Sequence, residues 1–365
     1  MKIKELTDHL ERIAPLAFQE PYDNAGLLVG NPNQDVRQVL ICLDCTEEVV
    51  EEAIRKQCDM IISHHPIVFK GLKKFTGKNY VERVLIKAIR HNIALYAIHT
   101  NLDNVFGGVS SKIADKLGLQ NHMVLSPKRN LLKKLAVYVP RTHVEIVRNA
   151  LFEAGAGSIG KYEECSYNTV GYGTFRALEG ANPSIGKSGT QERVEETKIE
   201  VIYPDHKERS VLVAMYEAHP YEEVAHDIFL LDVPFAEVGS GAIGNLPSPM
   251  SEIDFLALVK DRLNLQVIRH TKFRNKPISR VALCGGSGSF LLPDAKRSGA
   301  DIFITADYKY HEFFDAEDDL IIADIGHFES EQFTQELLLE IIQKKFVNFA
   351  VLLTEIETNP IKYYS

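Results

Sequence analysis

The stretch that decides the fold lies at residues 36–66 and reads VRQVLICLDCTEEVVEEAIRKQCDMIISHHP. Its first part, residues 36–44, is a short apolar run that predicts a buried strand. Apolar side chains at helical spacing follow over residues 46–57, behind Thr46, a residue type that caps helix N-termini. Residues 59–66 form a second apolar run. This order of strand, helix and strand is typical of a mainly parallel α/β sheet.

The same alternation recurs near both ends of the chain. An amphipathic helix is predicted at the N-terminus, and a helix and a strand over residues 80–92 and 93–103. Near the C-terminus, three stretches each begin as a strand and end in glycine or polar residues, at residues 278–289, 300–313 and 318–333. A helix over residues 330–346 and a last strand over residues 348–354 follow them. We therefore assign both ends of the chain to the α/β class.

The middle of the chain follows a different pattern. Residues 132–157 predict a strand and a helix closed by glycine. Residues 209–232 predict a strand, a helix initiated by Pro220 and a further apolar strand, and hairpin-like strands lie between the two stretches. Two strand–helix units with intervening strands indicate a small ferredoxin-like α+β domain.

The composition excludes several classes of protein. The 365 residues are enough for two or three domains, and 45% hydrophobic with 25% charged residues is usual for a soluble globular protein. No apolar run approaches the roughly 18 residues of a membrane-spanning helix, and the first residues do not resemble a signal peptide. A net charge of −9 disfavours nucleic-acid binding. Five scattered cysteines indicate a reduced compartment, so we expect a cytoplasmic protein.

Two adjacent histidines, His64 and His65, stand where the second apolar run ends. Neighbouring side chains on a strand face opposite sides of the sheet, so the pair can serve one site only beyond the strand's end. Pro66 supplies that end, because proline lacks a ladder donor. Neutral imidazoles are good ligands for transition metals. Taken alone, the pair fits a solvated loop equally well.

Other predicted strand ends also carry imidazoles and acids, namely His99 with Asp103, Asp307 with His311, and His327 with Glu331. In open parallel α/β sheets, ligands bind outside the carboxyl ends of the strands. His327 and Glu331 lie four residues apart at a predicted helix start, so both project from one face of its first turn. A solitary acid there could instead be stabilised by the helix dipole. Together with the other strand ends, the pattern favours a metal site.

The candidate metal ligands are His64, His65, Asp103, His327 and Glu331. Five ligands exceed the three plus water that a single catalytic metal typically uses. Two divalent ions about 3.5–4 Å apart, bridged by a carboxylate such as Glu331, would use all five. Because the set contains no thiolate, zinc, iron, manganese, nickel and cobalt all remain open, and among them we favour zinc.

These ligands come from both ends of the chain, which must therefore build one domain. We expect a discontinuous α/β metal-binding domain over residues 1–128 and 240–365, interrupted by an inserted ferredoxin-like domain over residues 129–239. The turn-rich stretches that mark the ends of the insertion lie at residues 126–130 and 244–252.

Nearly the whole chain resembles the GTP cyclohydrolase I type 2 family, also called the Nif-three-like proteins. The motifs that carry the resemblance are PYDNAGLLVG (21–30), ISHHPIVF (62–69), AIHTNLD (97–103), ITADYKYHEF (304–313) and DIGHFESE (324–331). Two positions depart from the family pattern, Tyr22 where tryptophan is expected and Ala306 where many members have glycine. Neither is a candidate ligand.

The resemblance implies a dinuclear metal centre held by the same five residues. It also implies that the insertion is similar to the CutA and P-II signalling proteins, and that the chain assembles as a hexamer of stacked trimers. The family name implies hydrolytic opening of the guanine ring of GTP.

We expect a metal-dependent hydrolase in which a metal-activated water attacks a nucleotide-like substrate. His99 and His311 are candidates for proton transfer, although His99 could instead orient Asp103. Phosphate contacts could come from Lys70, Lys73 and Lys74, or from the backbone of CGGSGS (284–289). The alternatives are a phosphoester hydrolase and a non-enzymatic metal-binding or regulatory hexamer.

Overall fold

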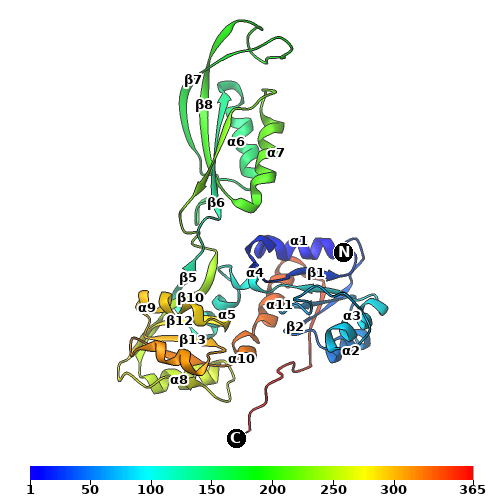
Figure 1. The fold of residues 1–365 in the computed structure, drawn as a ribbon, viewed down its shortest axis with the longest axis vertical. Helices are drawn as coiled ribbons and strands as arrows, with labels where there is room; N and C mark the ends of the chain where they lie inside the picture. Colours follow the sequence, from blue (N-terminus) through cyan, green and yellow to red (C-terminus); the bar gives the residue numbers. More distant parts are fainter. Residues whose placement is uncertain (365) are drawn as a thin grey trace. The chain divides into compact units, whose positions relative to one another are not determined.

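The computed structural model describes residues 1–364, which divide into two compact units (Figure 1). The first unit comprises Met1–Pro127 together with the chain from Glu237 onward, and the second comprises Lys128–Ala236. The first unit therefore contains both ends of the chain. Residues 244–250, expected near a boundary, continue a strand of the first unit.

The first unit contains two sheets. The first has the order β1-β4-β3-β2-β15, with the strands β1 (Gly26–Val29), β4 (Ala94–Ala97), β3 (Met60–Ser63), β2 (Gln38–Cys42) and β15 (Ala350–Leu353). All its pairings are parallel except that of β1 with β4. Because β15 pairs with β2, the C-terminal part of the chain completes the N-terminal sheet.

The second sheet mixes parallel and antiparallel pairings. Its order is β11-β14-β13-β12-β10-β5, with the strands β11 (Arg269–His270), β14 (Ile321–Asp324), β13 (Ile302–Ala306), β12 (Ile278–Ser287), β10 (Gly239–Met250) and β5 (Gln120–Pro127). Only β12, β13 and β14 run parallel. The expected parallel α/β pattern thus holds for the centre of this sheet but not for its edges.

The two sheets share one hydrophobic core with the helices between and around them. Those helices are α1 (Ile3–Ile13), α5 (Val109–Leu117), α8 (Glu252–Arg262) and α11 (Thr334–Lys345). Helix α5 packs on β10 and β12, whereas α11 packs on β2 and on α5 (Figure 1). Buried side chains from both sheets, such as Ile62 and Ile304, belong to the same apolar cluster. Both sheets are therefore held in one rigid arrangement.

Two further helices cover the outer face of the first sheet and begin as the sequence predicts. Helix α2 (Glu47–Arg55) starts at Thr46, whose hydroxyl accepts a hydrogen bond from the Val49 amide at 3.3 Å. Helix α3 (Tyr80–Arg90) starts at Asn79, whose side chain accepts from the Glu82 amide at 2.9 Å. Side-chain caps of this kind satisfy amides that a helix leaves free. The helix α9 (Leu292–Arg297) precedes β13 in the second sheet.

The strands that precede the candidate ligands are shorter than expected. Strand β4 ends at Ala97, and a single-turn helix, α4 (Thr100–Asp103), replaces the expected end of that strand. The stretch predicted as one helix over residues 330–346 is divided between α10 (His327–Glu331) and α11. Both changes place polar residues on short helical turns directly after strands.

The second unit is a four-stranded antiparallel sheet with two helices on one face. Its elements in chain order are β6 (Leu132–Pro140), α6 (Val144–Glu153), β7 (Tyr167–Arg176), β8 (Gln191–Pro204), α7 (Glu208–Ala218) and β9 (His226–Leu231). The sheet order is β7-β8-β6-β9. The expectation of a strand at residue 209 and a helix after Pro220 is wrong, because residues 208–218 form α7. Val211 and Met215, four residues apart, are both buried against the sheet.

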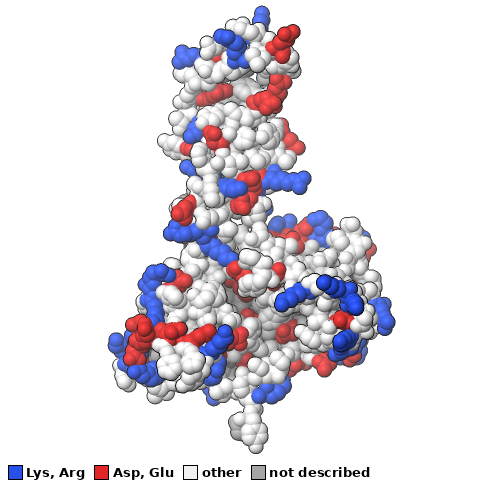
Figure 2. Space-filling model, viewed as in Figure 1, with Lys and Arg blue, Asp and Glu red and all other residues white. Residues whose placement is uncertain are grey.

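The surface of each unit carries charges of both signs. Lysine, arginine, aspartate and glutamate are interspersed on the face of each unit in Figure 2. In residues 1–364, none of the helices is both long and apolar enough to cross a bilayer.

Candidate metal centre

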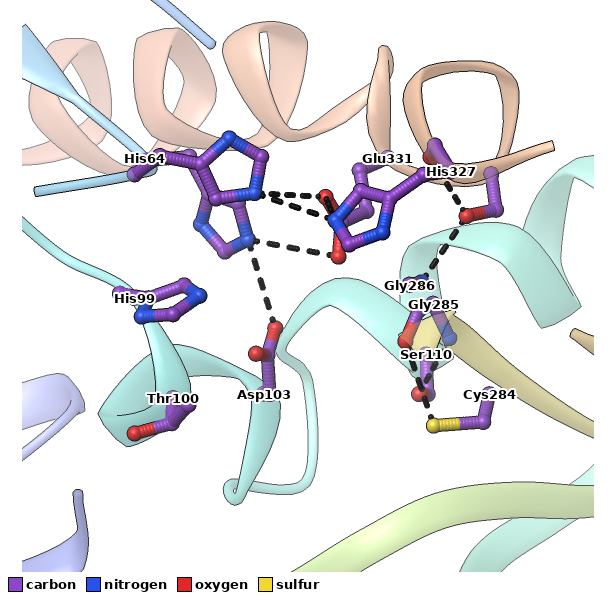
Figure 3. Close-up of polar contacts among 12 residues, drawn as sticks. His64, His99, Thr100, Asp103, Ser110, Cys284, Gly285, Gly286, His327 and Glu331 are labelled. Carbon is purple, nitrogen blue, oxygen red and sulfur yellow. Dashed lines mark hydrogen bonds and ion pairs between the residues drawn. The ribbon is translucent and has the colours of Figure 1, made fainter. Parts of the chain in front are cut away.

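The candidate ligands follow strands that belong to two different sheets. His64 and His65 come directly after β3, and Asp103 lies on α4 after β4, both in the first sheet. His327 and Glu331 lie on α10 after β14 of the second sheet. The expectation of a single sheet edge is therefore wrong, because the carboxyl ends of strands from two sheets supply the residues. Figure 3 shows the side chains of His64, Asp103, His327 and Glu331 pointing toward one another.

Glu331 lies at the centre of the cluster. Its Oε2 lies 3.0 Å from His65 Nε2 and 3.1 Å from His327 Nε2. Its Oε1 lies 3.8 Å from His64 Nε2, which is also 3.6 Å from Asp103 Oδ1. The ligand atoms of His65, His327 and Glu331 lie within 4.8 Å of one another, as do those of His64, Asp103 and Glu331. One buried carboxylate thus faces two sets of ligand atoms with its two oxygens.

Each of the three imidazoles makes a hydrogen bond through its Nδ1 atom. This atom lies 2.8 Å from the Ile98 carbonyl oxygen in His64, 2.8 Å from Asp44 Oδ1 in His65 and 2.6 Å from Asp307 Oδ2 in His327. Because carbonyl and carboxylate oxygens accept hydrogen bonds, Nδ1 carries a hydrogen and Nε2 faces the cluster, where it would present a lone pair to a bound metal ion. Partners of this kind fix the rings of metal-binding histidines.

Several buried atoms of the cluster lack a hydrogen-bond partner, namely His64 Nε2, Asp103 Oδ1 and Glu331 Oε2. The Nε2 atoms of His65 and His327 lie 3.0 Å and 3.1 Å from Glu331 Oε2. Burying polar atoms without partners costs free energy, and a divalent cation would satisfy all of them at once. Imidazole nitrogens and carboxylate oxygens suit zinc, iron, manganese, nickel or cobalt. The residues therefore fit a metal ion.

The charges around the cluster attract protons and cations alike. Burial opposes the charged form of His65, but Asp44 and Glu331 outweigh it and raise the pKa of His65 to about 10. Burial also opposes the charged form of His327, and Glu331 raises the pKa of His327 to about 9. Burial and the Glu331 carboxylate raise the pKa of Asp103 to about 7. The negative field that holds these protons would equally hold a metal ion.

His99, a candidate for proton transfer, faces the cluster and is held by Asp23. Its Nδ1 lies 2.8 Å from Asp23 Oδ1, and its ring centre lies 5.3 Å from those of His64 and His65. Burial opposes the charge of Asp23, but hydrogen bonds from His99 and a neighbouring threonine outweigh it and lower the pKa of Asp23 to about 2. The carboxylate bonded to His99 is therefore Asp23 rather than Asp103.

His311 and the three candidate lysines lie away from the cluster. His311 is exposed on the 3-10 helix Tyr310–Ala316, with its ring centre 5.1 Å from that of Tyr310 and 6.4 Å from that of Phe314. It does not line the cavity beside the cluster, and neither do the exposed side chains of Lys70, Lys73 and Lys74. The structure gives none of these four residues a contact with the candidate ligands.

Three acids that orient the imidazoles were not singled out as such from the sequence. Asp44 follows the apolar run at residues 36–44, so its place at a strand end was a usable signal. Asp307 was noted at a strand end beside His311, yet its observed partner is His327. Asp23 follows no predicted strand and lies in a motif that had no assigned role, so only the folded structure reveals its contact with His99.

Comparison with known proteins identifies close relatives over the full length. A Bacillus subtilis (strain 168) protein named "GTP cyclohydrolase 1 type 2 homolog" is 39% identical over 99% of this chain and 98% of its own length. A Staphylococcus epidermidis relative of the same name is 36% identical over the whole of both chains. The crystal structure of a Bacillus cereus protein related to NIF3 matches with a TM-score of 0.86 and 39% identity, covering 100% of this chain and 99% of the other.

A Staphylococcus aureus protein of known structure also matches, with a TM-score of 0.80 and 32% identity over 100% of this chain and 99% of that one. The family model described as Duf34/NIF3 (NGG1p interacting factor 3) matches residues 1–360. The resemblance seen in the sequence motifs is thereby confirmed, and the chain belongs to the Duf34/NIF3 family.

Proposed function

We propose that the protein is a metal-dependent hydrolase whose cluster of His64, His65, Asp103, His327 and Glu331 holds two divalent metal ions. The observation that carries this proposal is the position of Glu331, whose two carboxylate oxygens face two separate ligand groups. A bridging carboxylate between two ions is the arrangement found in two-metal hydrolases.

Each ion would have two ligands of its own and share Glu331. His65 and His327 would hold one ion with Oε2, whereas His64 and Asp103 would hold the other with Oε1. This incomplete coordination leaves positions for water, as catalytic sites require. Two bound ions would supply Lewis-acid activation of a water near neutral pH. We favour zinc, because four-coordinate sites of nitrogen and oxygen ligands suit it well.

His99 is the residue best placed to exchange a proton at this site. Asp23 binds its Nδ1, so its Nε2 is left as an acceptor beside the imidazoles of the cluster. A neutral imidazole so oriented can accept a proton and return it to a leaving group. The name of the curated relatives supports a nucleotide-like substrate, and phosphoester hydrolysis is the nearest alternative chemistry.

The test has two measurements, of metal content and of turnover. Elemental analysis of the wild-type chain is expected to find two ions, and His327→Ala and Asp103→Asn are each expected to retain about one, because each substitution removes a ligand of only one group. The control His311→Ala is expected to retain both. Turnover of nucleosides, nucleotides and phosphoesters should require metal and be lost in the ligand variants. Full metal content in both ligand variants would refute the proposal.

We further propose that residues 129–239 form an inserted ferredoxin-like domain, similar to CutA and P-II proteins, through which chains associate as a hexamer of stacked trimers. The order of β6, α6, β7, β8, α7 and β9 with its antiparallel sheet supports the ferredoxin-like assignment. Large apolar side chains on β7 and β9, among them Tyr172 (62% exposed) and Leu230 (59% exposed), support an association surface. Native mass spectrometry should find six copies of the 41.0 kDa chain, and a monomer would refute the hexamer.

A further inference from the structure

The cavity beside the cluster has a wall that is unusual for a nucleotide site. It has a volume of about 510 Å³, within the range of small-molecule sites, and it is open to His65, His99 and Glu331. Among the residues that line it, four are acidic, namely Glu20, Asp44, Asp103 and Glu331, and none is lysine or arginine. The wall itself therefore offers no lysine or arginine side chain to a phosphate group.

Further acids stand directly behind the wall. Asp23 binds His99 and Asp307 binds His327, which brings the carboxylates around the cavity to six. Two divalent ions would bring four positive charges, so the six negative charges of the carboxylates still exceed the positive charges by two. A triphosphate carries several negative charges near neutral pH, and like charges repel strongly where water is partly excluded.

The other groups expected to meet phosphates do not do so. The side chains of Lys70, Lys73 and Lys74 are exposed and do not line the cavity. The glycine-rich stretch lies partly within β12 and has two of its amides engaged within the protein. The Gly285 amide donates to Ser110 Oγ at 3.4 Å and the Gly286 amide to Ser330 Oγ at 2.9 Å (Figure 3). These two amides are therefore not free to bind a phosphate group.

The lining of the cavity includes five aromatic rings. Tyr22, Phe69, Tyr80, Phe290 and Phe328 line the cavity. Three of them are largely exposed, Tyr22 at 69%, Phe290 at 64% and Tyr80 at 59%. Exposed aromatic rings around an acidic pocket favour stacking on a planar ligand that carries no negative charge.

On the basis of the two-metal site proposed above, we infer that the cavity takes an uncharged planar heteroaromatic compound of the nucleoside or free-base class, and that it discriminates against nucleoside triphosphates. The aromatic rings hold the ring system beside the metal ions, and the carboxylates exclude the anion. The recognition element is the charge of the wall, which acts before any chemical step.

The inference is tested by binding, with guanosine and GTP as matched probes for the zinc-loaded full-length protein. Calorimetry is expected to give guanosine an affinity at least about tenfold higher than that of GTP, because only GTP meets the excess of carboxylates. Raising the salt concentration from about 50 mM to about 500 mM should narrow this gap by screening the repulsion. GTP binding as tightly as guanosine, or no measurable guanosine binding, would overturn the inference.

Two substitutions test the two features of the cavity wall, its negative charge and its aromatic rings. Ser287 is exposed, lines the cavity at the end of β12, and is no candidate ligand. Ser287→Lys is expected to raise GTP affinity about tenfold and to change guanosine affinity less than about twofold, because it adds a cation. Phe290→Ala should weaken guanosine binding about tenfold by removing a stacking surface, whereas Phe314→Ala, at a ring of similar exposure (66%) outside the cavity, should not. Unchanged affinities in both Ser287→Lys and Phe290→Ala would overturn the inference.

Metal analysis of these samples and of the ligand variants separates the proposal of a two-metal site from the inference about the substrate. If two ions are bound through the five ligands and GTP still binds more tightly than guanosine, only the inference about the substrate fails. If zinc is retained when those ligands are replaced, the two-metal function itself fails.

Discussion

Lys133 in the second unit and His65 in the first unit each lie between two carboxylates, and they differ in what balances the charge. In the second unit, Lys133 Nζ lies 2.6 Å from Asp205 Oδ1 and 2.6 Å from Glu208 Oε2. These hydrogen bonds raise the pKa of Lys133 above its already high value. A lysine is permanently charged under such conditions, so the chain itself completes this arrangement.

In the first unit, His65 lies between Asp44 and Glu331, at 2.8 Å and 3.0 Å. An imidazole gives up its proton far more readily than lysine, and further lone pairs from His64 and His327 converge on the same space. The charge that completes this group must therefore come from outside the chain, as protons or as metal ions. The comparison teaches that a basic side chain between two carboxylates can serve stability, as at Lys133, or binding, as at His65.

The largest expected effect follows from removing the shared carboxylate. Glu331→Ala should abolish binding of both ions, with an affinity loss greater than about 100-fold, because both ligand groups lose a member. Zinc titration with a chelating competitor measures the loss. Glu336→Gln, at an exposed acid on α11 paired with Lys116, is the matched control and should bind zinc normally. Retention of even one ion at wild-type affinity in Glu331→Ala would contradict the bridging role.

A second prediction concerns pH. The pKa values of His65 and His327, about 10 and about 9, lie above the value near 6.5 of an unfolded histidine. In metal-free protein their contribution to stability is complete below about pH 6.5 and is lost as the pH rises through the folded pKa values. The unfolding temperature of the metal-free form should therefore decrease between about pH 8 and pH 10. The unfolding temperature of the zinc-loaded form should not decrease over this range.

The same protons must leave when metal binds. At pH 7.5, zinc binding should release between about one and two protons, since metal ligands are unprotonated. Calorimetry in two buffers of different ionisation enthalpy gives this number. Binding without proton release would show that the two imidazoles are not ligands.

A smaller effect is expected from the acids behind the ligands. Asp44→Ala should weaken zinc binding about tenfold, because it frees the ring of His65 without removing a ligand. The equivalent change beside Lys133, Asp205→Ala, should leave zinc affinity unchanged. Equal effects of the two variants on zinc binding would remove the distinction between the two carboxylate pairs.

The sequence allowed much of the first unit to be predicted, because its signals are local. Residues 36–66 read as strand, helix and strand from apolar spacing, and the cap at Thr46 is confirmed. Whether strands share one sheet depends on pairing between distant segments, which periodicity does not encode. The division into two sheets was therefore missed. The misread start of α7 has another cause, since a short apolar run such as residues 211–215 fits a strand or a helix.

For the candidate site, the sequence supplied residue types but not directions. His64, His65, Asp103, His327 and Glu331 were selected because they follow strands, and the structure places all five in one cluster. The acids that bind Nδ1 were not assigned, because the direction of a side chain depends on packing against segments far away in sequence. His311 illustrates the same limit, as it also follows a strand but lies exposed on a 3-10 helix.

The smallest predicted effect concerns the complete ionic group of the second unit. Lys133→Met leaves Asp205 and Glu208 without their shared cation, yet both carboxylates remain partly exposed to water, at 53% and 33%. Solvent screening keeps the contribution of such pairs small, so the free energy of unfolding should fall by about 1 kcal/mol or less. Urea denaturation measures this change, and zinc content should stay at the wild-type level. A loss of zinc in this variant would mean that the two units are coupled, and the separation of stabilising from binding charges would not hold.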